Sequence, residues 1–374
     1  MTNAASRVDL AIFTHDLQCG GAEKVCVLLA NAFARRGLSV DLVVRRKVGV
    51  LAGDLVAGVR LVDLGAPRVR HALVPLARYL ARERPRRLLA ALWPLTSIAV
   101  WAALLARVET RVVVSDHTIL SNTRPGLSRP GRALMSLAMR ASYRWAAGVV
   151  AVSATVAADV ARLAGLAPDS ISTISNPVDG PDTGAEADPE VLARWSGETP
   201  RLISVGNLKA VKDHETLLRA VARLRERRPC RLLVLGEGPL RGRLERLAGD
   251  LDLAGAVTFA GHAPRPAAYL RHADLFVLSS RSEGFGISLV EALSCGVPVV
   301  STDCGGPREI LDGGRFGRLT PVGDHARLAD ALAEALADPV DRDMLSARAA
   351  CYGADRALDA YARVLDLGGP AARP

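Results

Sequence analysis

The segment that decides the fold spans residues 279–307 and reads SSRSEGFGISLVEALSCGVPVVSTDCGGP. An apolar run ends in serines, and Glu283 is followed by a glycine turn at residues 284–286 that opens a helical pattern carrying Glu291. The helical pattern stops at Gly296, and a proline then opens a second apolar run. A strand, a turn, a helix and a second strand in this order predict a βαβ unit of a parallel sheet.

The same segment carries groups suited to a polar, anionic ligand. Backbone N–H groups at the start of a helix have no partner inside the helix and can hold anionic oxygens. The two glycines remove side chains that would block a close approach. Glu283 and Glu291 can both accept hydrogen bonds from hydroxyl groups, such as those of a sugar and a ribose. In an alternative interpretation Ser288-x-x-Glu291 is a capping box, and Glu291 only satisfies a helix end.

Apolar runs and helical patterns alternate along most of the chain, which predicts an α/β fold with parallel sheets. A helix over residues 22–36 has its expected core positions at Val25, Leu28, Leu29 and Ala32. Residues 176–200 are rich in proline, glycine and acidic residues, and we interpret them as an interdomain linker that holds one short helix. The expected strands cover residues 8–14, 39–44, 59–64, 88–93, 111–115, 148–152 and 170–174 in the first half, and 201–205, 231–235, 257–260, 275–279 and 297–301 in the second.

The composition excludes several classes of protein. Hydrophobic residues make up 49% and charged residues 23% of the chain, as in a soluble globular protein. The six cysteines form no C-x-x-C pair and no export sequence opens the chain, which favours free thiols and a cytoplasmic location. The uncharged stretch 88–106 has the length of a membrane span, but Pro94, Thr96 and Ser97 interrupt it. We expect a buried strand over 88–93 and a helix over 96–106 instead.

Positive charge is concentrated in the first half of the chain. Residues 1–180 contain 23 Lys and Arg against 12 Asp and Glu, whereas the remainder contains 25 against 27. This asymmetry indicates an anionic partner for the first half. No nucleic acid is expected, because no zinc-finger, basic-zipper or RNA-recognition signature accompanies the charge. Residues 71–89 and 129–144 have the pattern of basic amphipathic helices, either for peripheral contact with an anionic membrane or as ordinary surface helices.

Three further motifs follow expected strands. Residues 15–24, HDLQCGGAEK, place Gly20 and Gly21 at the start of a helix, where they form either a phosphate-binding loop or a plain tight turn. Residues 206–212, GNLKAVK, bring Lys212 to a strand end, where an ammonium group could stabilise a departing phosphate. A surface lysine is the alternative there. His117 lies just past the strand 111–115 and is either a site residue or a polar loop residue.

Residues 279–307 resemble the E-x7-E signature of the retaining glycosyltransferases of family 4. This resemblance implies the GT-B fold, in which two Rossmann-like parallel-sheet domains face each other across a cleft. It implies an acceptor-binding domain over 1–178, a nucleotide-sugar-binding domain over 179–351, and a C-terminal helix over 352–374 that crosses back to the first domain and ends in a tail. Residues 20–23 resemble the family's G-G-A-E loop. Residues 206–212 resemble its G-R-L-x-x-x-K pattern, with Asn207 in place of the arginine.

The resemblance also implies roles for individual residues. The catalytic residues would be Glu283, which contacts the donor sugar, Lys212, which stabilises the leaving group, and His117, beside the sugar. Asn207 is a departure, because an amide lacks the permanent charge and two-pronged grip of a guanidinium. Either Lys209 or another cation compensates, or leaving-group stabilisation is weaker in this protein. The remaining donor-binding residues would be Gly20, Gly21, Phe285, Gly286, Ile287 and Glu291, with Glu291 holding the ribose.

The function implied is retaining transfer of a sugar from a nucleoside-diphosphate sugar, with a UDP-sugar as the first choice. The acceptor would be a glycan or a lipid-linked glycan, such as a polyprenyl-diphosphate sugar at the inner face of the membrane. No metal and no cofactor are expected, since Lys212 and the helix-start amides replace a metal. Asp341-Arg-Asp343 matches a D-x-D motif but lies in a helical region away from any expected strand end. A sugar-nucleotide 2-epimerase, a phosphorylase of the same fold, and a catalytically silent nucleotide-sugar-binding protein remain alternatives.

Overall fold

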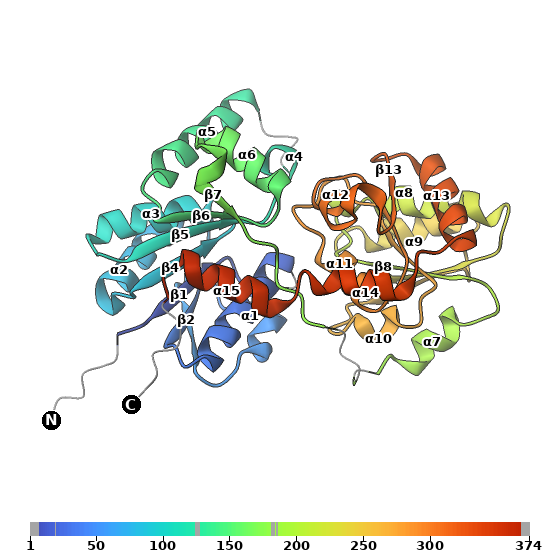
Figure 1. The fold of residues 1–374 in the computed structure, drawn as a ribbon, viewed down its shortest axis with the longest axis horizontal. Helices are drawn as coiled ribbons and strands as arrows, with labels where there is room; N and C mark the ends of the chain where they lie inside the picture. Colours follow the sequence, from blue (N-terminus) through green and yellow to red (C-terminus); the bar gives the residue numbers. More distant parts are fainter. Residues whose placement is uncertain (1–6, 19, 124–127, 181–183, 185, 368–374) are drawn as a thin grey trace. The chain divides into compact units, whose positions relative to one another are not determined.

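The computed structural model describes residues 7–18, 20–123, 128–180, 184 and 186–367, which belong to two compact units (Figure 1). Unit 1 comprises Met1–Pro177 and Asp355–Pro374, and unit 2 comprises Val178–Ala354. The chain therefore passes between the units twice, at the bond from Pro177 to Val178 and at the bond from Ala354 to Asp355. Unit 2 is a continuous insertion in unit 1.

Unit 1 is built on a seven-stranded parallel sheet of order β3-β2-β1-β4-β5-β6-β7. All five residues of β1 are buried, since helices cover both faces of the sheet and an apolar run is then required. The strand order reverses between β1 and β4, and in such sheets ligands bind at the carboxyl ends of the strands near the reversal. The strands are β1 (Leu10–Thr14), β2 (Val40–Val44), β3 (Val59–Asp63), β4 (Arg87–Ala91), β5 (Arg111–Asp116), β6 (Gly148–Ala151) and β7 (Ile171–Thr173).

The helices of unit 1 include one whose buried side differs from the expectation. In α1, Val25 and Leu29 are buried as expected, but Leu28 and Ala32 are only partly buried, while Cys26 and Phe33 are buried. The reason is that the turn η1 (Val50–Asp54) also packs on α1, where the Asn31 amide donates to the Asp54 carbonyl at 2.7 Å. The helices are α1 (Gly21–Arg35), α2 (Leu73–Glu83), α3 (Leu95–Ala106), α4 (Leu120–Thr123), α5 (Arg129–Tyr143), α6 (Ala154–Ala164) and α15 (Ala354–Val364), with the further short turns η2 (Val69–Ala72) and η3 (Pro168–Ser170).

Three expectations about segments of unit 1 have different outcomes. The segment 71–89 is helical only up to Glu83, because Pro85 cannot continue a helix and β4 begins at Arg87. The expected helix over 129–144 is present as α5. The uncharged stretch 88–106 forms β4 and α3, as predicted. In the described part of the chain, no helix combines the length and the apolar character needed to cross a membrane.

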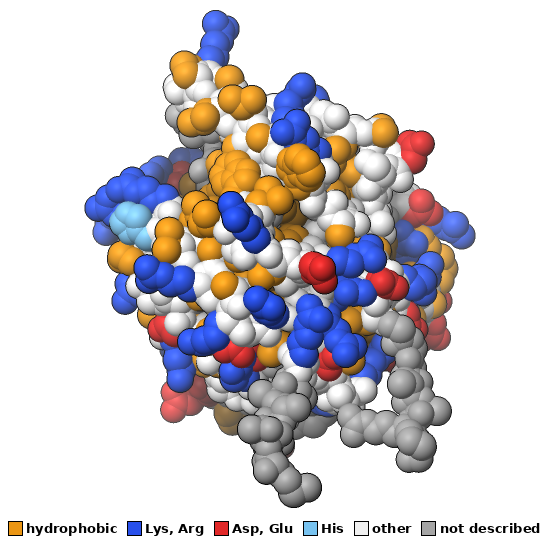
Figure 2. Space-filling view, turned by 90° about the vertical axis from the view of Figure 1, so that its left-hand side faces the viewer, with side chains coloured by type: hydrophobic (Ala, Val, Ile, Leu, Met, Phe, Trp, Pro, Cys, Tyr) orange, Lys and Arg blue, Asp and Glu red, His pale blue; other side chains and the backbone are white. Residues whose placement is uncertain are grey.

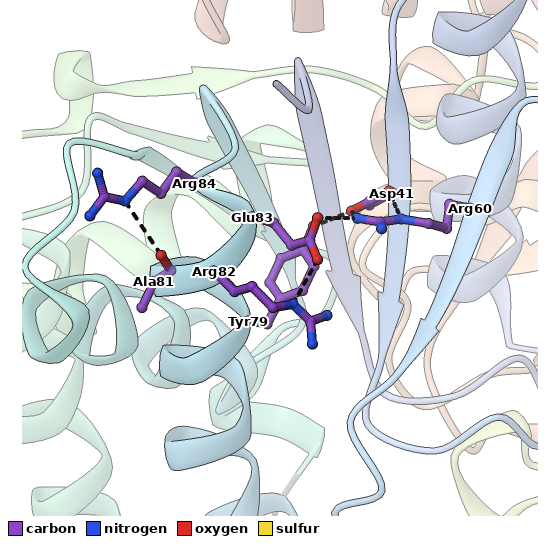
Figure 3. Close-up of polar contacts among 7 residues, drawn as sticks. All are labelled: Asp41, Arg60, Tyr79, Ala81, Arg82, Glu83 and Arg84. Carbon is purple, nitrogen blue, oxygen red and sulfur yellow. Dashed lines mark hydrogen bonds and ion pairs between the residues drawn. The ribbon is translucent and has the colours of Figure 1, made fainter. Parts of the chain in front are cut away.

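A buried ionic network fixes the edge of the unit 1 sheet (Figure 3). The Asp41 carboxylate is 2% exposed and accepts two hydrogen bonds from Arg60, at 2.8 and 2.6 Å, and one from the Tyr79 hydroxyl at 2.5 Å. Arg60 also bonds to Glu83 at 2.7 Å. Burial beside Asp41 raises the pKa of Tyr79 well above its usual value, so the hydroxyl remains a donor. The network joins β2, β3 and α2 near the amino ends of the strands, opposite to their carboxyl ends.

Unit 2 has a six-stranded parallel sheet of order β10-β9-β8-β11-β12-β13. Strand β13 was not predicted, since it is three residues long and lies between Gly317 and Pro321. The expected short helix of the 176–200 segment is α7. The strands are β8 (Arg201–Val205), β9 (Arg231–Leu235), β10 (Val257–Gly261), β11 (Leu275–Leu278), β12 (Val299–Thr302) and β13 (Arg318–Thr320). The helices are α7 (Pro189–Trp195), α8 (His214–Arg225), α9 (Arg241–Asp250), α10 (Ala267–Leu270), α11 (Ile287–Ser294), α12 (Gly306–Ile310), α13 (His325–Ala337) and α14 (Arg342–Ala350), with short turns η4 (Ala210–Lys212) and η5 (Asp312–Gly314).

Helix α15 returns the chain to unit 1 and packs against its sheet. The Arg87 side chain donates to the Leu365 carbonyl at 2.5 Å and pairs with Asp366 at 2.8 Å. Tyr361 is fully buried, with its hydroxyl 3.1 Å from the Ser115 hydroxyl. Helix α15 is therefore part of the core of unit 1.

Candidate functional site

The loop that carries Glu283 follows β11 and is held against the loop that follows β12. The Glu283 amide donates to the Cys304 carbonyl at 3.0 Å, and the Glu283 carbonyl accepts from the Gly306 amide at 3.0 Å. A Cβ atom on Gly306 would lie 2.3 Å from the Phe285 carbonyl oxygen. Only glycine permits this approach. Gly306 therefore allows the loop after β12 to pack closely against the loop that carries Glu283.

Lys212 and Glu283 form an ion pair in unit 2. Nζ of Lys212 lies 2.6 Å from Oε1 of Glu283, and the two side chains are 24% and 13% exposed. The Ser280 hydroxyl donates to the same carboxylate oxygen at 2.6 Å. Lys212 is therefore not a solvated surface lysine. The structure brings together two residues that the sequence analysis selected independently, and it adds Ser280, which that analysis did not select.

The backbone around Lys212 fixes the direction of its side chain. Lys212 ends η4, and its carbonyl accepts from the Ser279 hydroxyl at 2.9 Å. The next residue, Asp213, has a left-handed φ of 48° and is the N-cap of α8. The Asp213 carboxylate accepts from the Thr216 hydroxyl at 2.9 Å and pairs with Arg281 at 3.0 Å. The β8 and β11 loops are thus joined by further contacts besides the ion pair, including a hydrogen bond from the Arg281 amide to the Val211 carbonyl at 2.8 Å.

Helix α11 begins without a side-chain cap. Its N-cap is Gly286, with φ 116°, a conformation that favours glycine, and this residue has no side chain to cap the helix. Phe285 before it and Ile287 after it complete the start of the helix. The capping-box interpretation of Ser288 and Glu291 is wrong, because the helix starts before Ser288. Glu291 is half-buried within α11.

Glycines also allow the loops after β8 and β9 to pack closely. A Cβ atom on Gly236 would lie 2.0 Å from the Gly206 carbonyl oxygen, and one on Gly238 would lie 2.5 Å from the Leu208 carbonyl oxygen. The Leu208 amide donates to the Glu237 carbonyl at 2.9 Å. These contacts fix the backbone on both sides of Asn207, which is partly exposed next to the exposed Lys209.

In unit 1, Gly20 and Gly21 lie at the carboxyl end of β1, at the start of α1. Gly20 is the N-cap in an extended conformation and has no side chain to cap the helix, and the Glu23 carboxylate of the first turn lies beside it. This helix start lies next to the strand-order reversal, where ligands bind in such sheets.

His117 follows β5 and is 8% exposed. Its Nδ1 lies 3.2 Å from Oδ1 of Asn176, and its Nε2 lies 3.1 Å from the Ser115 hydroxyl. Since Oδ1 of Asn176 can only accept, Nδ1 carries the proton. Burial lowers the pKa of His117 to about 4, so the ring is neutral at pH 7. Both ring nitrogens have partners that sequence reasoning missed, because no local pattern marks Ser115 or Asn176.

The two units hold different members of the predicted site. Gly20, Gly21 and His117 belong to unit 1, whereas Asn207, Lys212, Glu283, Phe285, Gly286, Ile287 and Glu291 belong to unit 2. Asp341 of the D-x-D sequence caps α14, accepting from the amides of Asp343 and Met344 at 2.7 and 3.3 Å. Over the described ranges, no group of three His, Cys, Asp or Glu side chains is placed to hold a metal ion.

Comparison with known proteins gives matches along both halves of the chain. Residues 19–180 match the family model described as Glycosyltransferase Family 4, and residues 193–351 match that of Glycosyl transferases group 1. The lipopolysaccharide core biosynthesis glycosyltransferase LpsE of Rhizobium meliloti (strain 1021) is 29% identical over 362 residues, which cover 92% of this chain and 96% of that protein. A Campylobacter jejuni N-acetylgalactosamine-N,N'-diacetylbacillosaminyl-diphospho-undecaprenol 4-alpha-N-acetylgalactosaminyltransferase is 30% identical over 181 residues, which are 48% of each chain.

Solved structures share the fold. Anabaena Alr3699/HepE in complex with UDP and glucose has a TM-score of 0.77 at 19% identity, and the match covers 96% of this chain and 99% of that one. Sucrose-phosphate synthase of Thermosynechococcus elongatus has a TM-score of 0.79 at 20% identity, with the same coverage. At these identities the likeness shows the fold alone, which is GT-B. Together with the two family models and the relative matched along nearly its whole length, it shows that the chain belongs to glycosyltransferase family 4, the retaining glycosyltransferases of GT-B fold.

Proposed function

We propose that the protein transfers a sugar from a nucleoside-diphosphate sugar, with a UDP-sugar as the first choice, to a glycan or lipid-linked glycan without a metal. The observation that most supports this proposal is the Lys212–Glu283 ion pair, in the same unit as the start of α11, where the N-cap glycine has no side chain. The UDP and glucose complex of the Anabaena protein supports the donor class. The lipopolysaccharide-core enzyme and the undecaprenol-linked acceptor of the Campylobacter enzyme support the acceptor class.

The proposed chemistry uses fixed charges and dipoles on the donor. The bond between the sugar C1 and the diphosphate oxygen breaks, and negative charge develops on the leaving phosphate. The Lys212 ammonium and the first-turn amides of α11 stabilise that charge. The acceptor hydroxyl attacks C1 from the same face, and its proton passes to the departing phosphate. Both hydrogen bonds to Glu283 reach Oε1, so that Oε2 can accept from a hydroxyl of the donor sugar.

The test is binding and transfer with UDP-, GDP- and ADP-sugars, with and without chelator. We expect one nucleotide class to raise the melting temperature, and we expect transfer to continue in chelator. Glu283→Gln should lower transfer at least about 100-fold while nucleotide binding persists. Glu334→Gln, which changes an exposed glutamate paired with Arg318, is the matched control. The proposal fails if no nucleotide-sugar binds, or if Glu283→Gln transfers like the wild type. Turnover that requires a metal would remove the metal-free claim.

The same assay separates the alternatives. An epimerase would convert the donor without an acceptor, and a phosphorylase would depend on inorganic phosphate. The substitution of Asn207 for the family arginine is the observation that favours a silent nucleotide-sugar-binding protein. Such a protein would bind the donor but show neither transfer nor slow donor hydrolysis.

We place the acceptor at an anionic membrane because of one surface of unit 1, which we name the α3–α5 face. Five large apolar side chains are at least half exposed there: Leu104, Leu105, Leu134, Leu137 and Trp145. Hydrogen bonds from Ser142 to Ser97, at 2.9 Å, and between Thr96 and Tyr143, at 2.8 Å, hold the two helices side by side. Figure 2 views the side of the molecule that carries α2, α3 and α5, and shows apolar side chains gathered in its upper half among Lys and Arg.

The charges on this face fit lipid phosphates. Arginines flank the apolar side chains at positions 107, 132, 140 and 144, all exposed, and neither α3 nor α5 contains an acidic residue. A second copy of the chain would bring like charges together, whereas an anionic bilayer pairs the arginines with phosphates and buries the leucines. The apolar side chains and the arginines thus favour the same occupant.

Vesicle flotation tests this part of the proposal. The protein should float with phosphatidylglycerol vesicles, less with phosphatidylcholine vesicles, and less again at high salt. Leu134→Ser with Leu137→Ser should abolish flotation and leave transfer to a water-soluble acceptor unchanged. The matched control is Val322→Ser with Met344→Ser, which changes exposed apolar residues of unit 2. Equal flotation of the two double variants, or dimerisation through this face, would contradict the membrane assignment.

A further inference from the structure

Hydrogen bonds hold the chain on both sides of the peptide bond that joins Pro177 to Val178. Before the bond, in unit 1, the Asn176 amide oxygen accepts from His117 at 3.2 Å. After it, in unit 2, the Val178 amide donates to the Tyr352 carbonyl at 3.1 Å. Val178 also pairs with Gly353 in a parallel bridge. The two places where the chain passes between the units are therefore neighbours on unit 2.

On unit 1 a buried hydrogen-bond relay joins the same two chain segments. The Tyr361 hydroxyl lies 3.1 Å from the Ser115 hydroxyl, which lies 3.1 Å from His117, which in turn bonds to Asn176. Tyr361 belongs to α15, directly after the second crossing, and Asn176 directly precedes the first. All four side chains are less than a tenth exposed. The carboxyl end of β5 thus anchors both crossings.

On unit 2 the Tyr352 ring connects the first crossing with the donor loop, residues 283–286. The ring packs edge-on against Phe285, with centroids 5.5 Å apart and planes at 73°. Arg348 lies over the Tyr352 ring at 5.3 Å and donates to the carbonyls of Glu309 and Ile310 at 2.7 and 2.8 Å. Tyr352 is thereby fixed in place while its ring contacts the donor loop and its carbonyl holds Val178.

We infer that Tyr352 and His117 are positioning residues that couple the donor loop to the linker bond between Pro177 and Val178. The inference rests on the proposed function, because that function makes residues 283–286 the donor loop. A ligand that moves Phe285 moves the ring of Tyr352, whose carbonyl holds the amide of Val178. His117 fixes the other side of the same bond through Asn176. This positioning role is separate from the contact with the donor sugar that the family resemblance implied for His117.

Hydrogen exchange on the full chain without ligand tests the coupling independently of activity. His117→Ala should speed exchange at residues 174–178 and, through the linker, at residues 283–286 in the other unit. Thr110→Ala is the matched control, because it removes another buried hydrogen bond of β5, to the Pro85 carbonyl at 2.7 Å. The control should leave residues 283–286 unchanged. Equal exchange of these residues in the two variants would overturn the coupling.

Donor binding gives a second readout. Tyr352→Leu should weaken UDP-sugar binding by about 2- to 10-fold, since an aromatic edge contact is worth roughly that factor, whereas Tyr352→Phe should restore it. The double variant Tyr352→Leu with His117→Ala tests the coupling directly. Its loss of UDP-sugar affinity should differ by more than about twofold from the product of the two single losses, because independent sites agree with that product within about twofold. Losses that multiply would refute the inference. If the wild type binds no nucleotide-sugar, the proposed function fails, and the ligand-free exchange experiment still decides the coupling.

Discussion

The ammonium group of Lys212 lies 2.6 Å from the carboxylate of Glu283, with both side chains shielded from most of the solvent. Each residue comes from a different loop, after β8 and after β11. The Ser280 hydroxyl bonds to the same carboxylate oxygen, which leaves the ammonium little freedom to move. A cation held in this way needs no reorganisation when charge develops on a leaving group.

Removing the ammonium should therefore reduce chemistry more than binding. We expect Lys212→Met to lower kcat by about 100- to 1,000-fold, with a much smaller change in donor affinity. Because the two residues act as a unit, Lys212→Met with Glu283→Gln should be little worse than either single variant. Steady-state transfer and calorimetric donor binding measure the two quantities. A kcat within a few-fold of wild type for Lys212→Met would show that this lysine does not stabilise the leaving group.

The residue at position 207 provides a gain-of-function prediction. Asn207→Arg should raise kcat several-fold, because a guanidinium adds a permanent charge and a bidentate grip on phosphate oxygens. If Lys209 already compensates, Lys209→Met should lower kcat in the wild type but have little effect in the Asn207→Arg background. Initial rates of transfer for the three variants separate these cases. No gain from the arginine and no loss from Lys209→Met would show that another group supplies the charge.

The close approach at Gly306 predicts a large cost for the smallest side chain. Gly306→Ala should destabilise the protein by about 1–3 kcal/mol, since the new Cβ would overlap the Phe285 backbone. Gly249→Ala is the matched control: Gly249 is exposed in α9 with open space around it, and the change should stabilise by about 0.5–1 kcal/mol. Urea unfolding measures both. Equal and small effects would mean that the β11 and β12 loops are not packed this tightly.

The burial of His117 predicts a pH dependence of stability with a definite sign. Its folded pKa, about 4, lies below the usual value of 6.5, so the folded state excludes a proton that the unfolded state takes up. This contribution is complete above pH 6.5 and is lost as the pH falls towards 4, with a slope of up to about 1.4 kcal/mol per pH unit. His214 has the same sign and the same lowered pKa, about 4. The difference between wild type and His117→Ala in urea unfolding at pH 7.5 and pH 5 therefore isolates His117.

The destabilisation caused by His117→Ala should be larger at pH 7.5 than at pH 5. At pH 5 the wild type loses free energy of unfolding because its buried His117 must stay neutral while the unfolded chain takes up a proton. The variant has no histidine at position 117 and does not lose this contribution. Equal destabilisation at both pH values would indicate that the ring is accessible to protons in the folded protein.

Sequence patterns predicted those features that depend on local order along the chain. The alternation of apolar runs predicted twelve strands close to their observed bounds, because a parallel sheet buried on both faces requires such runs. It missed β13, whose three residues are too few for any period. The buried side of α1 was partly wrong, since the turn η1 covers Asn31 from a distant part of the chain. Glu283 and Lys212 were selected from motifs, but their 2.6 Å contact required the fold. Ser280, Asn176 and Tyr352 act through tertiary neighbours, which no spacing in the sequence reveals.

The insertion of residues 178–354 into unit 1 has a consequence for how such proteins can be recombined. Because Val178 pairs with Gly353, the two junctions of the insert adjoin each other, and a segment from a relative could be spliced in at those two points alone. Such a chimera would exchange unit 2 while leaving the first sheet, its arginine-flanked surface and the buried Tyr361 intact. Conversely, a chain truncated after Ala354 would lose Tyr361, whose hydroxyl contacts Ser115, and would expose the apolar surface of unit 1 that α15 covers. Unit 1 is therefore completed only after unit 2 has been passed along the chain.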